Sequence, residues 1–134
     1  MPKLAKKRSA TAKDALPNTL RIAALAADRK ALALRAYDVR GLTVVADSFI
    51  MCSATSEPHV RAIVEAVKRG MREIGVRPSH IEGNAGDDWI LMDFGTTILN
   101  VFREEAREYY DLDGLWGDAP AIDLELDEPG QEKP

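Results

Sequence analysis

The sequence predicts a single small α/β domain with a mixed sheet of about five strands flanked by helices. The chain has 134 residues, the length of one domain, and is 46% hydrophobic and 30% charged, which is a globular composition. Short runs rich in β-branched and aromatic residues alternate with stretches in which apolar residues recur at helical spacing. The order of these segments is helix, two strands, helix, three strands and helix, with no internal repeat.

The first half of the chain begins with a helix over about residues 20–33, because Asn18 or Thr19 can cap an Ala/Leu/Arg-rich segment. Two neighbouring antiparallel strands follow at about 34–39 and 44–54.

A second helix follows, with Thr55 or Ser56 as its cap and Pro58 in its first turn. Gly75 ends this helix. Its apolar residues form one helical stripe: Val60, Ile63, Val64, Val67 and Met71. The second half continues with a short strand at about 79–82, a hairpin over 87–102 and a third helix from about 103 to 112.

The hairpin DDWILMDFGTTILNVF turns at Gly95-Thr96, a link that suits a type II′ turn because glycine adopts the positive φ it requires. This register predicts one apolar face directed at the core: Ile90, Met92, Phe94, Thr97, Leu99 and Val101. The opposite face mixes aromatic, aliphatic and polar side chains: Trp89, Leu91, Asp93, Ile98, Asn100 and Phe102.

Aromatic anchors ringed by polar groups are typical of protein–protein binding surfaces. We therefore expect a partner-binding surface made by Trp89, Leu91, Asp93, Asn100 and Phe102. The alternative is a second core face that the first helix covers.

The residues after the hairpin predict further packing. Only one of Tyr109 and Tyr110 is expected to face inward, and Leu115 with Trp116 is expected to pack as a satellite of the core. Arg107 is expected to form a surface pair with Glu104, three residues before it.

The two ends carry opposite charge. Residues 1–17 have a net charge of +4 and are expected to be a disordered basic arm, with an organellar transit peptide as the alternative. Residues 121–134 have a net charge of −4 and are expected to be a disordered acidic tail after a domain over 18–120. The acidic body argues against broad nucleic-acid wrapping and is compatible with a basic protein partner.

The sequence contains no Gly-rich phosphate loop, nucleophile elbow or zinc signature, so it predicts neither an enzyme nor a metal or cofactor site. Cys52 is expected in the core of a protein in a reducing compartment. The remaining candidates occur singly, and we expect structural carboxylates and surface histidines: Asp38, Asp47, Asp93, His59 and His80.

Several spaced motifs resemble one known family. They are W-x-L-x-D-x-G at 89–95, R-E-Y-Y-D-L at 107–112, L-W-G-D-A-P at 115–120, D-V-R-G-L at 38–42 and A-D-S-F-I at 46–50. Taken in their order along the chain, over about residues 20–120, they resemble the ribosomal silencing factor family, RsfS or Iojap.

The resemblance implies a non-enzymatic repressor of translation in the bacterial cytoplasm, with a nucleotidyltransferase-like fold that lacks the catalytic carboxylates. Members bind the large ribosomal subunit through ribosomal protein L-fourteen and block subunit joining when nutrients are scarce. Asn100 stands where the family usually has a histidine, so a pH response of that histidine would be lost. The alternatives are a degenerate nucleotide-binding nucleotidyltransferase and a large-subunit assembly factor, and the free protein could form a homodimer.

Overall fold

Five strands form one mixed sheet in the described residues of the computed structural model, which are 16–84 and 86–126. The strand order is β1-β2-β5-β4-β3, in which β2 and β5 run parallel and the other neighbours run antiparallel. This confirms the predicted fold class. The strands are β1 (Leu32–Asp38), β2 (Ser48–Ala54), β3 (His80–Glu82), β4 (Trp89–Asp93) and β5 (Thr97–Arg103).

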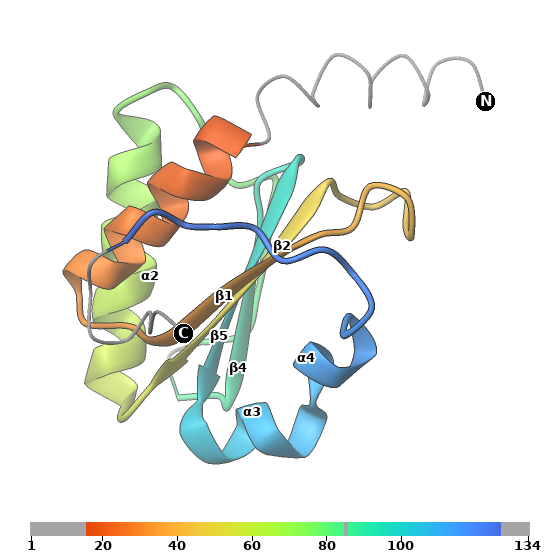
Figure 1. Ribbon diagram of the computed structural model, residues 1–134. Coiled ribbons are helices and arrows are strands. Elements are labelled where there is room, and N and C mark those ends of the chain that lie inside the picture. Colours follow the sequence, from red (N-terminus) through yellow and green to blue (C-terminus); the bar gives the residue numbers. More distant parts are fainter. Residues whose placement is uncertain (1–15, 85, 127–134) are drawn as a thin grey trace.

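A helical layer covers one face of the sheet. It consists of a helix at residues 16–28 and of α2 (Glu57–Arg72), which lie side by side in Figure 1. The larger core cluster lies between this layer and the sheet, and it includes the hairpin's predicted apolar face. Ile90, Met92, Leu99 and Val101 are at most 3% exposed there.

Local capping explains where α2 begins and where the first helix ends. Ser56 caps α2 by accepting a hydrogen bond from the backbone N–H of His59 at 3.2 Å, as expected. The first helix stops about five residues earlier than predicted, because Lys30 adopts a left-handed φ of 64° and the N–H of Ala31 donates back to Ala26.

Two short helices, α3 (Glu104–Tyr110) and α4 (Leu112–Leu115), pack on the opposite face of the sheet (Figure 1). The sequence predicts one helix here, with the first helix as the alternative cover for this face. The helix is divided because Asp111 adopts a left-handed φ of 50° and its carboxylate caps the N–H of Gly114. A smaller second core therefore lies under α3 and α4.

The hairpin has the predicted register. Trp89 faces Phe102, and Asp93 faces Ile98. The N–H of Phe94 donates to the carbonyl of Thr97 at 2.9 Å, and Gly95 has a φ of 89°, which is the conformation that the tight turn requires.

The loop between β1 and β2 is longer than predicted. β2 begins at Ser48 rather than near Val44, since pairing with β1 ends at Asp38. Val44 and Val45 are 62% and 59% exposed in this loop, so their β-forming character does not reflect strand pairing.

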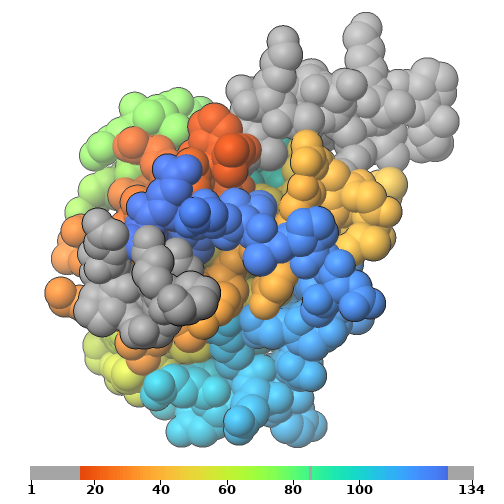
Figure 2. Space-filling view, viewed as in Figure 1, coloured from red at the N-terminus to blue at the C-terminus, as the bar shows by residue number. Residues whose placement is uncertain are grey.

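The chain beyond residue 120 differs from the expected disordered tail in its first six residues. Ala121 bridges Tyr37 of β1, the N–H of Ile122 donates to Ala36 at 2.9 Å, and Leu124 is 2% exposed in the larger core. The space-filling view shows this segment lying against the body of the molecule (Figure 2). The domain therefore extends to at least residue 126. The rest of the expected tail, 127–134, and most of the expected arm, 1–15, lie outside the described residues.

Candidate partner-binding surface

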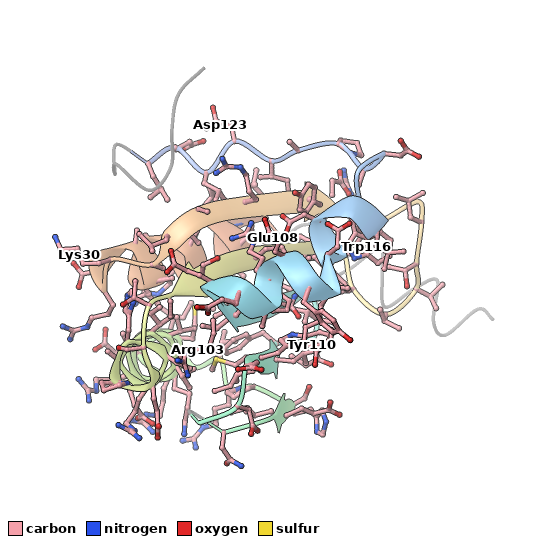
Figure 3. The ribbon with its side chains drawn as sticks, turned by 90° about the horizontal axis from the view of Figure 1, so that it is seen from below. Lys30, Arg103, Glu108, Tyr110, Trp116 and Asp123 are labelled. Carbon is pink, nitrogen blue, oxygen red and sulfur yellow. The ribbon has the colours of Figure 1, made fainter. Side chains whose placement is uncertain are left out.

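Four aromatic rings stack from the second core out to the surface. The ring of Phe102 in β5 stacks on that of Trp89 in β4 with centroids 5.1 Å apart and an interplanar angle of 26°. Tyr110 of α3 lies 5.0 Å from Trp89, and Tyr109 meets Tyr110 edge-on at 5.1 Å. We call this series the aromatic ladder. Figure 3 labels Tyr110 at the end of α3.

Exposure rises along the aromatic ladder. Phe102 is fully buried and Trp89 is half-buried, whereas Tyr110 is 47% and Tyr109 is 82% exposed. Phe102 therefore supports the surface from below and cannot be a direct anchor in this conformation, which differs from the sequence expectation. Its place at the surface is taken by Tyr109 and Tyr110.

Asn100 is also fully buried, at 0% exposure. Its side-chain Oδ1 accepts a hydrogen bond from Nε1 of Trp89 at 3.0 Å, and its Nδ2 donates to the carbonyl of Ile50 at 3.3 Å. Both ends of the amide are thus satisfied inside the protein. Asn100 fixes the orientation of the indole and offers no group to a partner.

Asp93 and Leu91 remain half-buried at the surface, along β4 from Trp89. Oδ1 of Asp93 accepts a hydrogen bond from the N–H of Gly95 at 2.8 Å, the turn-capping role expected of this carboxylate. The structure thus keeps Trp89, Leu91 and Asp93 of the predicted set together at one accessible edge, and it places Asn100 and Phe102 beneath them.

Arg107 attaches α3 to the sheet rather than pairing with Glu104. Its Nε and Nη2 donate to the two carboxylate oxygens of Asp113, each at 2.9 Å. Its Nη1 donates to the carbonyl of Ala33 at 2.7 Å and to Oγ of Ser53 at 3.0 Å. This bidentate ion pair is largely buried, with 13% of the Arg107 side chain exposed, so it holds α3 and α4 against β1 and β2.

Tyr37 completes the network, since its hydroxyl donates to Asp113 at 2.9 Å. Burial, together with the hydrogen bond to Asp113 and its negative charge, raises the pKa of Tyr37 to about 12. Burial alone would raise the pKa of Asp113, but hydrogen bonds from Arg107, its charge and the hydrogen bond from Tyr37 outweigh burial and lower that pKa. This network therefore favours an ionised Asp113 and a protonated Tyr37.

Carboxylates gather on α3 and α4, the short helices that follow the sheet and carry the exposed end of the aromatic ladder. A shallow depression of about 450 Å³ on α3 and α4 is lined by Glu104, Glu105, Arg107, Glu108, Asp111 and Asp113. The only cation in this lining, Arg107, is already paired with Asp113. The same short helices thus carry exposed aromatic rings and an excess of negative charge, a combination that suits a basic protein partner.

The other candidate residues have structural roles. Cys52 is fully buried, and burial raises the pKa of its thiol to about 12, so it is an inert core residue as predicted. Asp38 pairs with Arg40 at 2.7 Å, and Nε2 of His59 lies 2.9 Å from the carbonyl of Arg29. Trp116 packs on Phe49 as expected, with centroids 5.1 Å apart, whereas Leu115 is 66% exposed.

In residues 16–84 and 86–126, no group of three or more His, Cys, Asp and Glu side chains is arranged to hold a metal ion. Within the same ranges, no helix is long and apolar enough to cross a membrane.

The sequence pattern indicated that one of Tyr109 and Tyr110 faces solvent, but not which one or what lies beside it in space. Adjacent residues on a helix point about 100° apart, so two neighbouring tyrosines on a short surface helix point in different directions. Tyr110 packs on Trp89 because of the way α3 lies across the sheet. The spacing of residues in the sequence does not determine that orientation.

Comparisons with known proteins agree with this structure. The model of the family "Ribosomal silencing factor during starvation" matches residues 12–134. The ribosomal silencing factor of Bacillus subtilis is 39% identical over 108 residues, which cover 80% of this chain and 92% of the relative. The mouse protein named "Mitochondrial assembly of ribosomal large subunit protein 1" is 34% identical over 73 residues, covering 52% of this chain and 32% of the mouse protein.

Two solved structures share the fold. A protein from Bacillus halodurans superposes with a TM-score of 0.68 at 31% identity, covering 78% of this chain and 96% of that one. A protein from Chromobacterium violaceum superposes with a TM-score of 0.73 at 24% identity, covering 84% and 93%. The family match over most of the chain and the extent of the Bacillus subtilis alignment together show that this chain belongs to the ribosomal silencing factor family.

Proposed function

We propose that this chain represses translation by binding ribosomal protein L-fourteen on the large ribosomal subunit and blocking the approach of the small subunit. Its membership of the ribosomal silencing factor family supports a regulatory role at the ribosome and not an enzymatic one. The protein would act in the compartment that holds its ribosomes, the cytoplasm of a bacterium.

The aromatic ladder is the observation that carries the proposal. Trp89 packs on the exposed ring of Tyr110, and Tyr109 meets Tyr110 edge-on, so less side-chain freedom is lost when a partner covers them. Rigid aromatic residues of this kind are common anchors of protein interfaces. The neighbouring carboxylates of α3 would attract a basic ribosomal protein and orient it.

Tyr109 and Tyr110 are the best probes of this surface. Trp89 is a poor probe, because it stacks on Phe102 and donates to Asn100, so its removal would also disturb the fold. We expect the double variant Tyr109→Ala/Tyr110→Ala to weaken binding to isolated large subunits by about thirtyfold or more, the usual effect of losing an anchor worth about 2 kcal/mol. Co-sedimentation of the variant with large subunits measures this, and adding small subunits shows whether joining resumes.

A matched control comes from the other side of the sheet. Ile74 is 48% exposed after the end of α2, so Ile74→Ala removes a similar exposed apolar group away from the aromatic ladder. This variant should bind and block joining like the unchanged protein. Equal binding by the tyrosine variant and the control would show that the aromatic ladder is not the docking surface.

A second candidate function is assembly of the large subunit, which the name of the mouse relative favours. An assembly factor would bind immature large subunits more tightly than mature ones and would leave joining of mature subunits intact. Sedimentation against both kinds of particle separates the two roles. Titration with ATP and magnesium tests the remaining alternative, a degenerate nucleotidyltransferase, since it alone predicts heat of binding.

A further inference from the structure

We propose that the outer face of α2 is a second contact surface, which binds the phosphate backbone of RNA without regard to sequence. This inference rests on the proposed function, because it assumes that the protein docks on an RNA-rich particle. The residues concerned are Lys68, Arg69 and Arg72 of α2 and Arg77 just after it. We call them the basic helix face.

Charge is divided between the two sides of the sheet. The helical layer, residues 16–31 and 55–78, carries eight basic and four acidic side chains. The rest of the described chain carries four basic and fourteen acidic side chains. In residues 16–84 and 86–126 of this protein of net charge −4, eight of the twelve cations thus lie in the layer opposite α3. Figure 1 shows α2 and α3 on opposite sides of the sheet, and Figure 3 shows nitrogen-tipped side chains on the outer side of α2.

The cations of the basic helix face are available to a ligand. Arg69, Arg72 and Arg77 are exposed, and within residues 16–84 and 86–126 none of the three forms an ion pair. The acidic side chains nearby are already engaged in part, since Glu57 pairs with Arg61 at 3.0 Å and Glu73 lies 3.6 Å from Arg21. Glu65 is the one acidic residue of α2 outside these pairs.

Helical spacing brings these cations together. Lys68, Arg69 and Arg72 lie within an arc of about 100° on the helix surface, on the side away from the buried residues Val60, Ile63 and Val67. Basic residues in a last turn also stabilise a helix through its dipole, but that effect fades beyond the turn. It does not account for Arg77, which lies beyond the helix end, or for the excess of cations over the whole layer.

A row of unpaired cations fits a phosphate backbone better than it fits another protein surface. Neutralising phosphates releases counterions, so such contacts strengthen binding in a strongly salt-dependent manner and need no base recognition. The acidic remainder of the molecule would keep free RNA from wrapping around it. The contact therefore adds to protein docking, as a second linked site raises overall affinity.

The test compares two double variants that change the net charge equally. Arg69→Gln/Arg72→Gln removes two cations of the basic helix face, and Arg35→Gln/Arg40→Gln removes two cations of the opposite side. Binding to large subunits is measured over a series of KCl concentrations, and binding to a short RNA duplex and to vesicles containing phosphatidylserine is measured at low salt. Circular dichroism melting shows whether each variant is folded.

We expect the α2 variant to bind large subunits more weakly and to reduce the slope of log K against log[KCl] by about 1–2, with little change in the control variant. Low-salt binding to the RNA duplex should fall only in the α2 variant. An unchanged slope with intact subunit binding would overturn this inference and leave the proposed function standing. RNA binding that depends on Arg69 and Arg72, without any binding to subunits, would overturn the proposed function instead. Binding to the vesicles but not to the duplex would assign the face to membranes and overturn the inference.

Discussion

Asn100 shows at the residue scale how one buried polar group shapes a surface it does not reach. The amide accepts from Trp89 and donates to Ile50, so one side chain bridges β4, β5 and β2. A neutral imidazole also has one donor and one acceptor, and histidine, the residue that the family resemblance suggests for this position, could make the same two contacts. An imidazolium has two donors and would have to release Trp89.

Because a neutral histidine could replace the amide, Asn100→His tests the two hydrogen bonds that Asn100 makes with Trp89 and Ile50. The variant should unfold with nearly the same free energy as the unchanged protein at pH 8, where imidazole is neutral. Its stability should fall as the pH drops below about 6.5, because the buried site disfavours protonation. Urea denaturation followed by tryptophan fluorescence at pH 8 and pH 5.5 measures the difference. Parallel pH profiles of the two proteins would show that the amide is not held by these two contacts.

At the scale of elements, the network of Arg107, Asp113 and Tyr37 at the corner between α3 and α4 fixes both short helices to the sheet. Asp113 joins Arg107 to Tyr37 and so connects both short helices to the strands β1 and β2. Because α3 carries Tyr109 and Tyr110, this corner also sets where the aromatic ladder emerges. Helices this short are not stable alone and depend on such tertiary contacts.

Asp113→Asn keeps the shape of the side chain and removes its charge. We expect it to lower the free energy of unfolding by about 1–3 kcal/mol at pH 7, because Arg107 loses its bidentate partner. The lowered pKa of Asp113 means that its contribution is present above its ordinary value of about 3.9 and is lost as the pH falls through the lowered value. The difference between variant and parent should therefore shrink between pH 5 and pH 2 in urea titrations. A constant difference would show that the charge of Asp113 does not stabilise the corner.

The sequence predicted the elements whose signals are local and failed where the cause lies in distant contacts. The cap at Ser56, the hairpin register and the buried Cys52 follow from short-range chemistry and were predicted correctly. Arg107 was assigned to Glu104 because only neighbours on the helix are visible in a sequence, whereas its actual partners include Ala33 and Ser53. The burial of Asn100 and Phe102 was missed for the same reason, since it depends on tertiary packing, and the partner surface itself stays a prediction.

The edges of the sheet raise a question for the whole molecule, because exposed strand edges invite pairing with other chains. β3 is only three residues long and carries exposed His80 and Glu82, which limits pairing at that edge. β1 is longer, and residues 120–122 cover it through hydrogen bonds to Asp38 and Ala36. This segment belongs to what composition identified as an acidic tail, although the alternation of Ile122, Leu124 and Leu126 with acidic residues is the period of a strand.

Leu124 is the residue through which this covering segment depends on the core. It is 2% exposed within the larger core cluster, while Leu126 is only partly buried against the same cluster. We expect Leu124→Ala to lower the free energy of unfolding by about 2–4 kcal/mol, and Leu126→Ala to lower it by less, since the penalty follows the buried volume that is lost. Detachment of the segment would also free the β1 edge, so the Leu124 variant should self-associate more than the Leu126 variant in sedimentation velocity. If thermal and urea denaturation give the same stability for both variants, residues 121–126 are not part of the folded domain, and the β1 edge must be protected in another way.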